Sequence, residues 1–186
     1  HNARVRDRFE TALRDRGVTI HADDAVVQVS PGKLKTASGT EVEADEILWV
    51  TAAGAPSWPA EAGLEVDEKG FVKVGDTLQS VSHPEVFAAG DIAAMVNHPR
   101  PKSGVFAVRQ GKPLERNLRR LLLGRSPVPF RPQKKFLSLV STGDKYAVAS
   151  RGGFSIQGPN VWRWKDWIDR RFMDKFNDLP DMEEDA

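Results

Sequence analysis

The chain has 186 residues, of which 40% are hydrophobic, and its 27 Lys and Arg against 26 Asp and Glu give a formal net charge of +1. This balance argues against nucleic acid as the main partner, because phosphate binding needs an excess of cations on one face. With no cysteine, disulfides, cysteine-ligated zinc and thiol nucleophiles are excluded from this stretch. No apolar run approaches the ~20 residues needed to cross a bilayer and no signal peptide is recognisable, so we expect a cytoplasmic protein.

The first fifty residues predict a helix followed by short strands. Apolar residues recur at helical spacing over residues 4–16, and Gly17 stands where a C-cap glycine belongs. Short strands with intervening turns are then predicted at 18–20, 26–30 and 33–36. Residues 41–44 lead into the apolar run 47–50, which is typical of a strand buried on both faces.

The middle of the chain predicts two further strands and a long helix. Residues 71–74 alternate, and residues 86–91 are an apolar strand ended by a glycine and a carboxylate. A helix is predicted over 103–123, with a kink or a break at Pro113.

The character of the sequence changes from Phe130 onward. Strands at 136–140 and 146–149 flank the turn residues 141–144, which is a hairpin signal, and residues 154–157 add a third strand. A helix is predicted over 162–176, and an acidic tail follows from Leu179.

Three segments are candidates for ligand chemistry. The small residues around Gly54 let a cofactor or another backbone approach closely, or they form an ordinary tight turn. The strand that ends at Gly90-Asp91 would deliver a carboxylate to the carboxyl edge of a sheet, where ligands of doubly wound folds bind; the alternative is a helix N-cap. The helix that begins near Ser103-Gly104 would offer unpaired N–H groups with partial positive charge, or it is a plain buried helix.

In this order the three segments resemble the pyridine nucleotide-disulfide oxidoreductase family of two-dinucleotide flavoproteins. The segment Val50-Thr51-Ala52-Ala53-Gly54-Ala55-Pro56 is a looser version of the Ala-Thr-Gly strand end and Pro-containing crossover that close the family's nicotinamide domain. The glycine-led strand 70–74, the approach 77–84 and Ala88-Ala89-Gly90-Asp91 match the family's return to its flavin domain.

The resemblance implies an α/β fold: a partial, three-layer, two-dinucleotide-binding fold with a small C-terminal β-hairpin and helix. It divides the chain into the C-terminal half of an NAD(P)-binding domain (1–56), the C-terminal part of an FAD-binding domain (57–126) and a hairpin-helix segment (127–186). It implies an FAD site in which Asp91 binds cofactor hydroxyls and the helix points at the flavin, with Lys102 as an added cation. The cofactor-binding residues predicted in this way are Gly54, Gly90, Asp91, Ile92, Lys102, Ser103 and Gly104. No catalytic residue and no metal ligand is assigned.

Within the family the chain is similar to type II NADH dehydrogenases and to the NADH dehydrogenase-like module fused ahead of selenide, water dikinase in some bacteria. This similarity implies an intact enzyme that passes hydride from NAD(P)H to FAD and then to a quinone-like or unknown acceptor. The G-x-G-x-x-G loops of such an enzyme are absent from this sequence, so we expect a C-terminal part of a longer flavoprotein. The alternative is a non-catalytic interaction or regulatory module derived from the same fold.

Three expectations concern the 186-residue chain itself. It should be inactive and hold no FAD tightly, because the main phosphate cradle is absent. It should form a homodimer, because its apolar strands lack neighbours. The helix over 162–176 carries an apolar face with Trp164, Ile168, Phe172 and Phe176 beside cations, which suits a peripheral membrane contact. Packing within the protein is the alternative, and the aspartates of this helix favour it.

Overall fold

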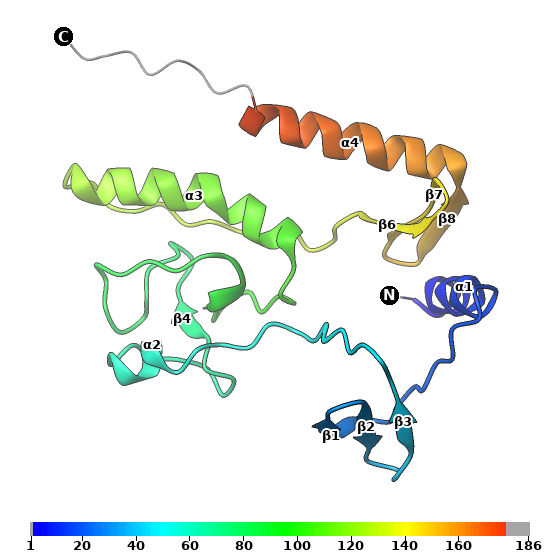
Figure 1. Ribbon diagram of the computed structural model, residues 1–186. Helices are drawn as coiled ribbons and strands as arrows, with labels where there is room; N and C mark the ends of the chain where they lie inside the picture. Colours follow the sequence, from blue (N-terminus) through cyan, green and yellow to red (C-terminus); the bar gives the residue numbers. More distant parts are fainter. Residues whose placement is uncertain (1, 178–186) are drawn as a thin grey trace. The chain divides into compact units, whose positions relative to one another are not determined.

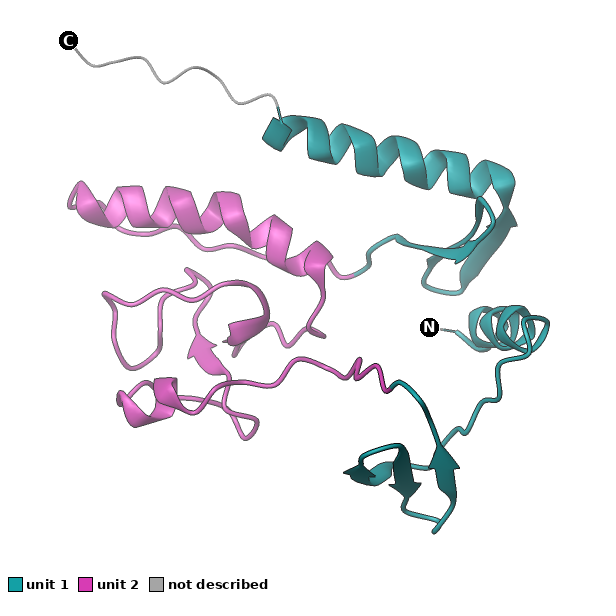
Figure 2. Cartoon of the chain, viewed as in Figure 1, with its two compact units in different colours: residues 1–46, 135–186 teal, residues 47–134 magenta. Residues whose placement is uncertain are grey.

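The computed structural model describes residues 2–177 (Figure 1). The chain forms two compact units, one made of residues 1–46 and 135–186 and the other of residues 47–134 (Figure 2). Both units contain helices and strands, so the protein is mixed α/β as the sequence predicts. The domain boundaries at residues 56 and 126 stay a prediction.

The first unit begins with helix α1 (Ala3–Arg14), which confirms the predicted helix. The Asn2 side chain caps it by accepting the N–H of Val5 at 3.0 Å, and Gly17 follows its end with a φ of +74°. Residues 18–20 form no strand, so that prediction is wrong. No described strand pairs with them, and a short segment of β-branched residues forms a strand only when a neighbouring strand supplies hydrogen-bond partners.

A three-stranded antiparallel sheet follows in the order β1-β2-β3. Its strands are β1 (Val26–Ser30), β2 (Lys33–Thr36) and β3 (Glu41–Glu43). The predicted buried strand at 47–50 is wrong: Leu48 is 88% exposed and Val50 is 80% exposed. A continuous apolar run becomes a buried strand only when strands on both sides supply hydrogen-bond partners, and no described strand does so here.

A second antiparallel sheet and the last helix complete the first unit. The strands β6 (Ser138–Gly143), β7 (Tyr146–Arg151) and β8 (Phe154–Gly158) pair in sequence order. The tight turn of the predicted hairpin lies at Asp144-Lys145, both with positive φ, rather than over 141–144. Helix α4 (Pro159–Asn177) starts with a proline, which is favourable at the first helical position. The predicted acidic tail lies outside the described residues.

Only the first turn of α4 belongs to the core of this unit. Val161 and Trp162 pack with Ala147 and Ala149 of β7. Helix α1 is fastened to the same sheet through side chains: Asn2 donates to the Gly152 carbonyl, Arg8 to Ser155, and Arg16 forms a 2.9 Å ion pair with Asp144. Farther along α4, the side chains of Trp164, Trp167 and Phe176 are exposed.

The second unit is built on two parallel strands. Strand β4 (Val72–Val74) pairs with β5 (Ala93–Met95), and the short helix α2 (Trp58–Glu61), the 3₁₀ turn η1 (Gly90–Ile92) and helix α3 (Gly104–Leu122) accompany them. The core is formed by the side chains of Val72, Val74, Leu78, Ala88, Ala93 and Met95. Asn117 of α3 is fully buried and bonds the backbone of Thr77 and Val128, so it ties the helix to the loops beside it.

Two predictions about this unit need correction. Residues 86–91 do not form a strand: Phe87 makes a single bridge to Gln79, and Gly90 turns the chain with a φ of +73°. Extended backbone cannot continue through such a residue, so the strand is β5, which follows Asp91 instead of preceding it. Helix α3 continues through Pro113, so the predicted break is wrong, and the proline leaves the Arg109 carbonyl without its usual donor. Among residues 2–177, no helix is both long enough and apolar enough to span a membrane.

Candidate cofactor site

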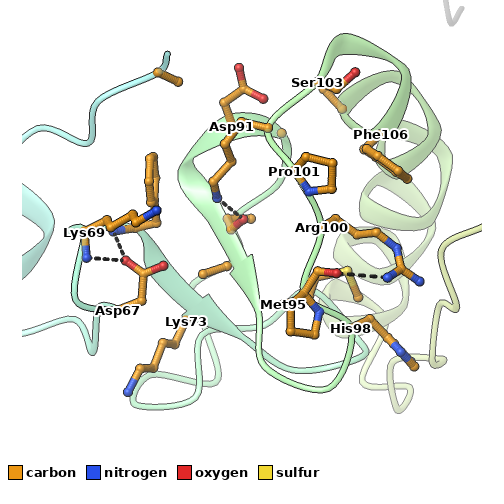
Figure 3. Close-up of a pocket in the computed structure, with 18 of the residues that line it drawn as sticks. Asp67, Lys69, Lys73, Asp91, Met95, His98, Arg100, Pro101, Ser103 and Phe106 are labelled. Atoms are coloured by element: carbon orange, nitrogen blue, oxygen red, sulfur yellow. Dashed lines mark hydrogen bonds between the residues drawn. The ribbon is translucent and has the colours of Figure 1, made fainter. Parts of the chain in front are cut away.

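A pocket of about 830 Å³ opens in the second unit between β5, the loop that follows it and the start of α3 (Figure 3). Its lining includes Asp91, Lys102 and Ser103, which the sequence predicts for a cofactor site. A volume of this size suits a small-molecule cofactor.

The turn at Gly90 aims Asp91 at this pocket. Ala89 is extended, Gly90 adopts a φ of +73°, and the chain closes into η1 before β5 begins. The Gly90 N–H donates to the side-chain oxygen of Gln110 on α3. Asp91 is exposed and lines the pocket, and Figure 3 marks no hydrogen bond to its carboxylate. Glycine supplies a conformation here that other residues adopt only with strain.

The first turn of α3 presents unused hydrogen-bond donors. Ser103 is extended and makes no side-chain cap, while its carbonyl accepts the N–H groups of Phe106 and Ala107. Within residues 2–177, the N–H groups of Gly104 and Val105 have no acceptor. The start of a 19-residue helix also carries a partial positive charge, so acceptor atoms of a ligand fit here.

Lys102 is held at the centre of the site by two contacts. Its Nζ donates to the Ala93 carbonyl at 2.7 Å and lies 3.8 Å from the centre of the Phe71 ring. Burial lowers the pKa of the Lys102 ammonium, and the nearby carboxylates of Asp67 and Asp91 oppose this shift. Two contacts therefore hold the Lys102 ammonium in place, and the two carboxylates only partly offset the effect of burial on its pKa.

The predicted site residues do not all face the pocket. Gly90, Asp91, Lys102 and Ser103 line it together. Gly54 does not, although its neighbours Ala52 and Ala53 do. Ile92 packs against the hydrophobic core, and Gly104 is the first residue of α3.

Sequence reasoning missed most of the lining residues, among them Phe71 and Gln110. Phe71 is buried and lies immediately before strand β4, so its pattern does not distinguish it from a core residue. Gln110 did carry a signal. It is four residues after the buried Phe106 on the same helix face, and an uncharged amide on a buried face needs hydrogen-bond partners.

No group of three His, Asp or Glu side chains in the described part of the chain is arranged to hold a metal ion. The arrangement suits an organic ligand with hydroxyl groups for Asp91 and acceptor atoms for Lys102 and the start of α3.

Comparison with known proteins gives the family. The model of the pyridine nucleotide-disulphide oxidoreductases matches residues 1–111, which is more than half of the chain. The chain belongs to this family.

The family relatives include dehydrogenases. The chain is 32% identical over 108 residues to an NADH dehydrogenase-like protein of Mycobacterium tuberculosis, covering 58% of this chain and 27% of that protein. It is 28% identical over 120 residues to a type II NADH:quinone oxidoreductase of Haemophilus influenzae, covering 55% and 27% respectively. The chain thus spans about a quarter of the length of these relatives.

Solved structures in the family share the fold. The sulfide:quinone oxidoreductase of Aquifex aeolicus matches 90% of this chain and 44% of its own, with a TM-score of 0.69 and 18% identity. The water-forming NADH oxidase of Lactobacillus brevis, bound to NADH, matches 81% and 33%, with a TM-score of 0.62 and 22% identity. At these identities the match concerns the fold alone.

Proposed function

We propose that the complete protein is an FAD-dependent oxidoreductase that takes hydride from NAD(P)H and delivers electrons to a quinone-like acceptor. The observation that carries the proposal is the shared pocket of Asp91, Lys102 and the unpaired donors at the start of α3. The named activities of the relatives, an NADH dehydrogenase-like protein and a type II NADH:quinone oxidoreductase, support the same direction.

The residues of the pocket fit the polar groups of this cofactor. The Asp91 carboxylate accepts hydrogen bonds from hydroxyl groups, and Gly90 leaves room for them beside the backbone. The N–H groups of Gly104 and Val105, with the Lys102 ammonium, suit an edge where negative charge grows. FAD, when bound, supplies the hydride acceptor and the electron carrier of the reaction. Gly54 and Ile92 remain part of the proposed site as residues that flank its lining.

The test begins with the visible spectrum of the complete gene product, purified and then incubated with FAD. We expect flavin absorption that stays with the protein after desalting. A second measurement follows NADH and NADPH oxidation with a soluble quinone. A protein that retains no flavin contradicts the whole proposal, whereas one that retains flavin without oxidising either nucleotide contradicts the assigned donor.

We also propose that α4 mediates a peripheral membrane contact. Beyond its first turn the helix exposes large apolar side chains: Trp164 is 41% exposed, Trp167 57% and Phe176 57%. Cations accompany them, and Arg171 lies 5.6 Å from the ring of Trp167. Aromatic residues beside cations are the composition of helices that lie in the headgroup region of a bilayer.

A further inference from the structure

Gln110 links the two halves of the proposed cofactor site. It belongs to α3, the residue is 6% exposed, and its Oε1 accepts the N–H of Gly90 twenty residues earlier in the chain. Because Gly90 holds the turn before Asp91, this hydrogen bond fixes the carboxylate relative to the start of the helix. A buried amide in such a place has a positional role whatever the ligand is.

The other end of the Gln110 amide is the Nε2 donor. A backbone N–H only donates, so Oε1 must be the atom that meets Gly90, and Nε2 is turned away from it. No acceptor for Nε2 is found among residues 2–177, and the side chain lines the pocket. Nε2 is accessible rather than buried, and because the side chain lines the pocket, an oxygen of a bound ligand can accept its hydrogen bond.

We propose that Gln110 is a binding and positioning residue of the cofactor site: it anchors the Gly90–Asp91 turn through Oε1 and donates from Nε2 to an oxygen of the bound cofactor's polar chain. This proposal rests on the proposed FAD site. It adds a contact from the second turn of α3, beyond the donors at the start of the helix.

The test separates the two ends of the amide with Gln110→Glu in the complete gene product. The variant keeps an oxygen for the Gly90 N–H but replaces the Nε2 donor with a carboxylate oxygen that cannot donate. We expect FAD to bind at least tenfold more weakly and the visible circular dichroism of the bound flavin to change. The thermal midpoint without FAD should stay within a few degrees of wild type.

Gln79→Glu is the matched control. Gln79 also donates through Nε2, to the Pro84 carbonyl, but it lies outside the pocket lining. We expect wild-type FAD affinity for this variant. If Gln110→Glu does not fold, Gln110→Met removes both polar ends at nearly constant length and should show the same loss. Wild-type FAD affinity in either folded Gln110 variant overturns the inference, whereas a wild-type protein that binds no FAD overturns the proposed function instead.

Discussion

Asp91 is the residue on which the proposed cofactor contact most directly depends. Its carboxylate is exposed in the pocket and has no protein donor that would compete with a ligand hydroxyl within the described chain. We expect Asp91→Ala to weaken FAD binding by about tenfold or more, since hydrogen bonds to a charged group contribute roughly 1.5–3 kcal/mol. Fluorescence titration of FAD measures this loss. Asp144→Ala, which removes an exposed carboxylate from the other unit, should have no effect; unchanged binding by the Asp91 variant would remove this residue from the site.

Gly90 should be required for its backbone conformation. An alanine Cβ at this position would lie 3.5 Å from the Ala107 Cβ, an ordinary contact, so crowding is not the obstacle. The obstacle is the backbone φ of +73°, which alanine adopts only with strain. Gly90→Ala should therefore lower the free energy of unfolding by about 1–2 kcal/mol. Urea denaturation measures the change. The control Gly111→Ala lies in helix α3 with open space around it and should raise the stability by about 0.5–1 kcal/mol. Equal effects at both positions would refute this account.

Lys102 should make the stability depend on pH in an identifiable way. Burial lowers its pKa below the ordinary 10.5, so the folded state releases this proton at a lower pH than the unfolded state does. Between the two pKa values the unfolded chain binds more protons, and stability therefore rises with pH in that window. Below it, both states are charged and the burial cost is fully present. Wild type should thus gain stability relative to Lys102→Met as the pH rises toward 10.5, as urea midpoints at several pH values would reveal. A constant difference would contradict the shift.

At the scale of elements, the two ends of helix α4 have different surroundings. Its first turn is held by Val161 and Trp162 in the core of the first unit, while the aromatic side chains farther along are exposed. Four-residue spacing places Trp164 and Phe172 on one face. Burying such a face in an interface removes apolar surface from water, which stabilises the contact by roughly 25 cal/mol per Å² of buried apolar area.

We expect the complete gene product to co-sediment with anionic phospholipid vesicles at low salt. The Trp164→Glu, Phe172→Glu double variant should stay in the supernatant, because it places two charges on the apolar face. Met173→Glu, Asn177→Glu adds the same two charges on the side of the helix opposite Trp164 and should still sediment. If the wild-type protein remains in the supernatant, α4 is a packing element and the membrane contact is wrong.

At the scale of the whole molecule, the 186-residue chain leaves much apolar surface uncovered. Leu48 and Leu122 are each 88% exposed, and neither is contained in a core of the described chain. We expect the purified chain to dimerise by covering such surface and to bind FAD more weakly than micromolar. Light scattering and FAD titration test the two statements separately: a monomer contradicts the first, and sub-micromolar binding contradicts the second. The resemblance to the module fused ahead of selenide, water dikinase implies that this chain could be part of such a fusion, and the reading frame that contains the chain tests this.

Local patterns in the sequence were sufficient for the elements whose stability is local. Helix α1, the β6-β7 hairpin and helix α4 follow from periodicity and turn residues that act over a few positions. Short contiguous motifs also pointed to Gly90, Asp91, Lys102 and Ser103, which line the candidate pocket, while their role in binding a cofactor stays a prediction.

Tertiary structure decided whatever depends on distant partners. The run 47–50 is as apolar as a buried strand, yet it forms none because pairing requires neighbours that no described strand provides. Asp91 precedes its strand because the Gly90 turn is held by Gln110, and Lys102 is fixed by Phe71 and Ala93. Hydrogen bonds and ring contacts between residues 9 to 31 positions apart leave no periodic trace in a sequence. Only the folded chain brings these groups within contact distance.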